Sequence, residues 1–143
     1  MNIEKLQNEV ERTEYWDRSI LDIQTQFFCD EVYLFVENDE EKCWKISFTS
    51  CYKVNYETDA NWRGIDNVKM MRDGQLGYYG QNITLEKHEE NNEFIKCSLD
   101  LSIMTMAIIC KDILVEEIKL KNTSFFWYDN IDENYKSSIL KRK

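Results

Sequence analysis

The stretch that decides the fold is Ile95-Lys96-Cys97-Ser98-Leu99-Asp100-Leu101-Ser102-Ile103, in which apolar and polar residues alternate without a break. In a β-strand, successive side chains point to opposite faces, so a period of two places all five apolar residues on one face. We therefore predict a strand with one buried and one solvated face. Such half-buried strands are typical of antiparallel sheets.

Apolar runs rich in β-branched and aromatic residues flank this strand and predict further strands. The runs cover residues 20–28, 32–36, 43–56, 82–88, 104–109 and 113–120. We expect a tight link near Cys29-Asp30 between the first two and a break at Ser50 in the third. Ile3, Leu6 and Val10 lie at helical spacing behind a possible cap at Asn2, which predicts a short N-terminal helix.

These elements predict an α+β, mostly β fold, with an antiparallel sheet or a sandwich of hairpins and a short N-terminal helix. Residues 57–81 contain all four glycines and predict a long excursion with a short helix at 68–72. In the last segment, we expect aromatic residues 125–128 to dock on the domain and the basic end to fray. No repeat or linker divides the chain, so we expect one domain over residues 1–143.

The exposed edges of such sheets need protection against pairing with other chains. The chain has no proline, which is one device that blunts an edge strand. We therefore expect charged side chains such as Lys42, Glu86 and Glu116 to protect the edges.

Composition and targeting signals predict a protein of the cytoplasm. The longest apolar stretch, residues 103–110, is far shorter than the roughly 20 residues that a membrane span requires. The N-terminus lacks the basic and apolar blocks of a secretory signal. The five cysteines are odd in number and contain no C-x-x-C pair, which favours free thiols over disulfides or a zinc site.

No motif predicts a catalytic residue, a metal ligand or a cofactor. The single histidine, His88, has no nucleophile that sequence can pair with it. The acidic groups lack the pattern of a calcium loop, and Gly74, Gly77 and Gly80 do not form a phosphate-binding fingerprint. A small enzyme that uses carboxylates of the glycine-rich middle segment, with His88 as a base, remains an alternative.

Charge is the feature that most clearly predicts a kind of partner. The formal net charge is -9, and residues 1–60 hold 14 acidic against 6 basic residues. A domain of this charge approaches a nucleic acid against its own field, so we expect no direct nucleic-acid binding. An acidic face instead attracts proteins that bind nucleic acid themselves, and it accelerates their association.

The expected contact surface combines an acidic hairpin tip, the opening of the next loop and one aromatic residue in a polar stretch. Its residues are Glu37, Asp39, Glu40 and Glu41 on the tip, Glu57 and Asp59 in the loop, and Trp62. Loops carry binding residues more often than the elements they connect. A solvated loop with no partner is the alternative interpretation of the same residues.

The segment Tyr15-Trp16-Asp17-Arg18-Ser19-Ile20-Leu21-Asp22-Ile23, the strand at 32–36 and the stretch Trp44-Lys45-Ile46-Ser47-Phe48-Thr49-Ser50-Cys51 carry a resemblance. They resemble immunity proteins of Gram-positive polymorphic-toxin systems, above all those encoded beside cell-wall-associated Rhs/YD-repeat toxins. The toxic domains of such systems include tRNA nucleases. The resemblance covers roughly residues 15–55, with a looser echo at 94–101.

What this resemblance implies is a role in contact-dependent inhibition: a cytoplasmic, non-enzymatic inhibitor that binds and blocks one toxin. Together with the charge, it predicts a basic nuclease domain as the partner and occlusion of its active cleft as the mechanism. It carries over no functional residue. A regulatory adaptor without a toxin partner is a further alternative that neither charge nor motif separates from the first.

Overall fold

The computed structural model describes residues 2–59, 61, 67–71 and 75–128. The elements that lie wholly within these residues include the helix α1 (Ile3–Glu11) and eight strands. The strands are β1 (Ile20–Gln26), β2 (Glu31–Glu37), β3 (Lys42–Thr49), β4 (Lys53–Thr58), β5 (Tyr78–Lys87), β6 (Ile95–Ser102), β7 (Met104–Cys110) and β8 (Asp112–Lys119). Two short 3₁₀ helices follow β4 and β8, η1 (Val68–Met70) and η3 (Leu120–Asn122).

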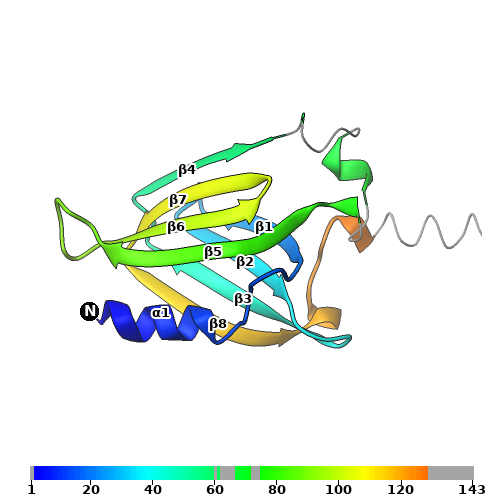
Figure 1. Cartoon of the computed structure of the whole chain (residues 1–143), viewed down its shortest axis with the longest axis horizontal. Helices are drawn as coiled ribbons and strands as arrows, with labels where there is room; N and C mark the ends of the chain where they lie inside the picture. Colours follow the sequence, from blue (N-terminus) through cyan, green and yellow to red (C-terminus); the bar gives the residue numbers. More distant parts are fainter. Residues whose placement is uncertain (1, 60, 62–66, 72–74, 129–143) are drawn as a thin grey trace, which may run out of the picture.

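The strands form two four-stranded antiparallel sheets that face one another as a sandwich (Figure 1). The first sheet has the order β1-β2-β3-β8, and the second has the order β4-β7-β6-β5. The chain crosses between the sheets after β3 and again after β7. This arrangement confirms the predicted class: a mostly β, antiparallel sandwich with a short N-terminal helix.

The predicted alternation on residues 95–103 is confirmed by burial. Cys97 and Leu101 are fully buried, while Lys96 and Asp100 on the same strand are exposed. On the other strands too, every second residue faces inward and completes the core between the sheets. These residues include Val32, Leu34, Ile46, Phe48, Ile83 and Ile108. Burial of this apolar surface is the main force that holds the two sheets together.

The third predicted run, residues 43–56, forms two strands, β3 and β4, and the predicted break at Ser50 between them is confirmed. Ser50 adopts a left-handed φ of 52°. At this point the chain leaves the first sheet at Thr49 and enters the second at Lys53. Two strands that follow each other in sequence therefore lie in different sheets, and β4 pairs with β7 instead of β3.

The aromatic segment after β8 covers part of the outer face of the first sheet. On the first sheet, Leu21, Phe35 and Cys43 point outward and are covered by Phe125 and Trp127. The Trp127 Nε1–H donates to the carbonyl oxygen of Leu21 at 2.7 Å. The prediction that the aromatic segment docks on the domain is thus confirmed, whereas the predicted fraying of the basic end lies outside the described residues.

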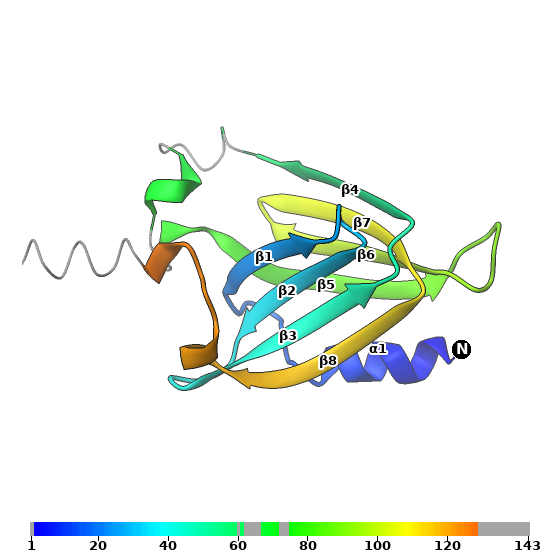
Figure 2. The same ribbon diagram turned by 180° about the vertical axis from the view of Figure 1, so that it is seen from behind.

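Helix α1 lies along one side of the sandwich, beside β5 and β8 (Figures 1 and 2). The Asn2 side chain accepts from the backbone N–H of Lys5 at 3.0 Å, so the predicted N-cap is confirmed. On the opposite side, β1 and β4 form sheet edges that α1 does not cover. Strand β4 is exposed at every position except the half-buried Val54.

Candidate functional site

The predicted acidic tip is the turn between β2 and β3, and Asp39 is the residue that shapes it. Its Oδ1 accepts hydrogen bonds from the backbone N–H groups of Glu41 and Lys42, both at 2.8 Å. These two bonds stabilise the carboxylate and lower the pKa of Asp39. Asp39 therefore has a structural role in the turn, in addition to any contact with a partner.

The other acids of the tip differ in how freely they face solvent. Glu37 accepts from the backbone N–H of Ser19 at 3.3 Å, and Arg18 donates to the Glu37 carbonyl oxygen at 3.3 Å. Glu40 and Glu41 are exposed, and within the described part of the chain their side chains form no ion pair or hydrogen bond. Glu40 and Glu41 are thus the two tip acids that are available to a partner.

Lysines that sequence reasoning had not placed here lie beside the tip. Lys119 and Lys121 line a surface depression of about 430 Å³ together with Glu40 and Glu41. Lys42 forms an ion pair with Glu117 on β8, with an N–O distance of 3.3 Å. The negative charge of the tip is therefore partly offset by the positive charges of Lys119 and Lys121, which lie about 80 residues away in sequence.

The second predicted group, Glu57 and Asp59, lies at the end of β4. Both residues line a surface groove of about 630 Å³, together with Thr58 and residues 102–105 of the β6–β7 turn. The backbone N–H of Asp59 donates to the Ile103 carbonyl oxygen at 2.8 Å, which fixes the loop against the turn. Among the described residues that line this groove, Glu57 and Asp59 are the charged ones, and both are acidic.

The two acidic groups lie at the same end of the sandwich but on different sheets, with the start of β5 between them (Figure 1). They do not form one cluster. Trp62, the predicted aromatic member of the surface, lies outside the described residues.

In the part of the chain that the structure describes, we find no group of residues arranged for the catalysis that the enzyme alternative requires. There, no group of three or more His, Cys, Asp or Glu residues could hold a metal ion. The buried Nδ1 atom of His88 has no hydrogen-bond partner among the described residues, and the ring lies 6.5 Å from that of Tyr52. Gly80 packs against the Tyr15 backbone, so it has a structural role rather than a role in binding phosphate. Gly64 and Gly74 lie outside the described residues.

One carboxyl group is held in a partly apolar site. Asp22 lies where the β1–β2 pairing shifts register, and it lines a cavity of about 180 Å³ with Leu76, Tyr78 and Phe126 among other residues. Burial raises the pKa of Asp22, and bonds from Gln24 and the Ile23 N–H partly oppose this shift. These partners account for both of its oxygens, and the described residues that line the cavity include no Ser, Thr, Cys, His or Lys.

Comparison with known protein families decides the identity. The model of the family described as "Immunity protein PIM7" matches residues 2–117, which span α1 and almost all of the sandwich up to β8. The chain belongs to the PIM7 family. It is therefore an immunity protein, a class that implies a cognate toxin as partner, and the immunity-protein part of the resemblance is confirmed.

Other comparisons add little to this assignment. A search of curated proteins gave no significant match. Among solved structures, the PIM7 protein is similar to a crystal structure of an uncharacterized protein from Neisseria gonorrhoeae, at 12% identity and a TM-score of 0.46. That likeness covers 71% of this chain and 92% of the other. Among the described residues, no helix is long and apolar enough to cross a membrane.

Sequence reasoning missed one feature that the structure makes obvious. Phe27 and Phe28 were expected within a strand, but β1 ends at Gln26 and both lie in the turn to β2. Phe27 is 68% exposed, and Phe28 is fully exposed. The available signal was an aromatic pair directly before the predicted link at Cys29-Asp30, in a position where turns favour Gly, Asn or Asp.

Proposed function

We propose that this PIM7 immunity protein binds and neutralises a basic nuclease toxin by occluding its active cleft. The observation that carries the proposal is the family match combined with a net charge of -9. A nuclease cleft is basic because it holds a polyanion. An acidic protein of fixed shape therefore competes with the nucleic acid for the same positively charged surface.

The contact surface that we propose includes the acidic tip and the groove at the end of β4. Glu40 and Glu41 face solvent on the tip, and Glu57 and Asp59 line the groove. Asp39 holds the tip in shape, while Glu37 bonds to the neighbouring strand end. A cationic side chain of the toxin would enter the groove and approach the Glu57 carboxylate there.

The setting that best fits this function is the cytoplasm of a Gram-positive cell. There the protein would protect its producer, in contact-dependent inhibition, against a cell-wall-associated Rhs/YD-repeat toxin with tRNA nuclease activity. Co-expression with the toxin encoded next to it is expected to rescue growth. No rescue and no complex on gel filtration would exclude this function.

Occlusion has a sharper test than rescue, because it predicts competition. With a catalytically inactive toxin, tRNA and the immunity protein are expected to displace one another. A ternary complex of toxin, tRNA and immunity protein would show that the cleft stays open, and it would contradict occlusion while leaving toxin binding intact.

The role of the tip is tested with Glu40→Gln/Glu41→Gln, which removes two charges and keeps the Asp39 turn. Association with the toxin is expected to slow by several-fold and to depend less steeply on salt, because charged surfaces act mainly on the association rate. The matched control is Glu4→Gln/Glu11→Gln on α1, which changes the net charge equally. Equal effects of both pairs would assign the effect to net charge and not to the tip.

A further inference from the structure

The turn between β1 and β2 has a backbone that its residues do not favour. Phe27, Phe28 and Cys29 have φ angles of 55°, 56° and 70°. The turn is closed by a bond from the Asp30 N–H to the Phe27 carbonyl oxygen at 3.0 Å. Left-handed backbone suits Gly, Asn and Asp, and three consecutive bulky residues there are unusual. Backbone strain of this kind clusters at functional sites.

Packing within the described part of the chain does not explain the two phenylalanines. Phe28 is fully exposed, and Phe27 is 68% exposed. Neither belongs to an apolar cluster of the described residues. The turn therefore presents two aromatic rings to solvent at the expense of local conformation, which is the reverse of what stability alone would select.

Two further exposed aromatic residues follow in the adjoining segment, Tyr52 directly before the uncovered strand β4 and Tyr56 within it. The Cys51 N–H donates to the Asp30 carbonyl oxygen at 2.9 Å, which holds the turn next to the start of β4 (Figure 2). Tyr52 is 67% exposed and Tyr56 is 65% exposed. We call Phe27, Phe28, Tyr52 and Tyr56 the aromatic edge. Along β4 this edge leads to Glu57, the first acid of the groove.

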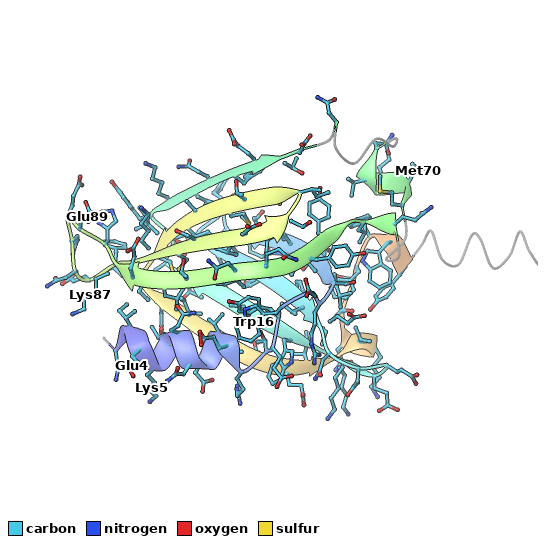
Figure 3. The ribbon with its side chains drawn as sticks, in the orientation of Figure 1. Glu4, Lys5, Trp16, Met70, Lys87 and Glu89 are labelled. Atoms are coloured by element: carbon cyan, nitrogen blue, oxygen red, sulfur yellow. The ribbon has the colours of Figure 1, made fainter. Side chains whose placement is uncertain are left out.

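The charges around the turn indicate the chemistry of the partner. Residues 27–31, 50–53, 87–94 and 110–112 form this end of the sandwich, which Lys87 and Glu89 mark in Figure 3. They contain six carboxylates, Asp30, Glu31, Glu89, Glu90, Glu93 and Asp112, against three lysines, Lys53, Lys87 and Lys111. Exposed rings at an end of the sandwich that carries an excess of acids are complementary to an apolar pocket with a basic rim.

We propose that the aromatic edge is the anchor of the toxin interface, with Phe28 and Phe27 inserted into an apolar pocket that basic residues of the toxin surround. This inference rests on the proposed function and adds the part of the surface that controls dissociation. Aromatic side chains that become fully buried are the residues that dominate binding energy, whereas rim charges act on association. The contact would run along β4 from the turn to Glu57 and Asp59.

The variant that tests the anchor is Phe27→Asn/Phe28→Gly, because Asn and Gly adopt left-handed backbone readily. Its unfolding midpoint in urea is expected to equal or exceed that of the parent. Its complex with the toxin is expected to dissociate about 30-fold faster or more, as for the loss of a buried aromatic anchor. The control is Leu114→Thr, which removes an apolar side chain that is 57% exposed on β8, and its dissociation rate is expected to stay within a factor of two or so of the parent's.

Cys29 provides a second readout in the unaltered protein. It is the exposed cysteine of the five, and it lies in the turn itself. Bound toxin is expected to slow thiol labelling of Cys29 by at least tenfold or so, in line with burial of the turn in the complex. Prior labelling with a bulky maleimide is expected to weaken the complex.

The outcomes separate this inference from the proposed function. If the parent protein binds no toxin, the proposed function fails. If the parent binds toxin but the Asn/Gly variant dissociates at the parental rate and Cys29 stays reactive in the complex, the anchor is overturned while the function stands. The parent protein could also form a homodimer on gel filtration that the Asn/Gly variant does not form. If that variant still releases the toxin at the parental rate, the anchor is overturned, and the aromatic edge is assigned to contact with a second copy of this chain.

Discussion

Gly80 at the start of β5 packs so closely against Tyr15 that a Cβ atom at position 80 would clash with the Tyr15 carbonyl oxygen. The approach is held by backbone bonds on both sides, from the Asp17 N–H to the Gly80 carbonyl oxygen at 2.8 Å and from the Gly80 N–H to the Arg18 carbonyl oxygen at 3.0 Å. The segment before β1 is thereby joined to the second sheet.

Gly80→Ala is therefore expected to destabilise the protein by about 2 kcal/mol or more, because backbone atoms cannot yield as a flexible side chain can. Gly77→Ala is the matched control. A Cβ atom there meets Ile103 Cδ1 at an ordinary 3.5 Å, and only the φ of 77° opposes the change, at about 1 kcal/mol. Urea unfolding measures both. A larger loss for Gly77→Ala would contradict the argument.

Gln7 is predicted to protect the free edge of β5. Its Nε2 donates to the Ile83 carbonyl oxygen and its Oε1 accepts from the Leu85 N–H, both at 2.8 Å. The side chain thus takes the place of a neighbouring strand. Gln7→Ala leaves both backbone groups without these partners and is expected to cost about 1–3 kcal/mol. Amide exchange at Leu85 should accelerate, whereas the exposed Asn8→Ala should leave it unchanged.

Asp22→Asn is expected to stabilise the protein modestly at neutral pH. Burial raises the pKa of Asp22 in the folded state. A raised carboxyl pKa contributes stability below the unfolded-state value near 4, and this contribution is lost as the pH rises through the folded-state pKa. The melting temperature of the Asp22→Asn variant should exceed that of the parent at pH 7, and the difference should shrink towards pH 4. A difference that grows on acidification would have the wrong sign.

At pH 8, we expect a thiol reagent to label one of the five cysteines rapidly, the exposed Cys29. Burial raises the pKa of Cys43 to about 11 and that of Cys51 to about 12. The pKa of Cys97 is also raised, first by its hydrogen bond with Cys110 across 3.9 Å and then by burial. The thiolate is the reactive form, so these groups should react only after unfolding. Labelling with and without urea counts both classes, and Cys29→Ser should abolish the fast one.

Much of the local structure followed from short-range patterns. The alternation at 95–103, the helical spacing of Ile3, Leu6 and Val10, and the cap at Asn2 all predicted elements that the structure contains. Each depends on the identity of residues a few positions apart and on backbone geometry. The predicted helix at 68–72 appears as the 3₁₀ turn at Val68–Met70.

The edges of the sheets were less predictable, because edge protection depends on contacts across the whole chain. We expected charged residues such as Glu86 to protect β5, but an amide and a phenol from the N-terminal segment bind that edge: the Tyr15 hydroxyl accepts from the Ile83 N–H at 3.0 Å. The spacing between Tyr15 and Ile83 in sequence gave no sign of this contact. Only the fold brings the two together.

By itself, the sequence determined the class of fold, the acidic character and the resemblance to immunity proteins, since these depend on composition, periodicity and residue identity. The tertiary structure decided which acids face solvent, where Lys119 and Lys121 offset them, and that Phe27 and Phe28 lie on an exposed turn. The physical reason is that exposure and electrostatic surroundings depend on residues far apart in sequence, which become neighbours only when the two sheets close on their common core.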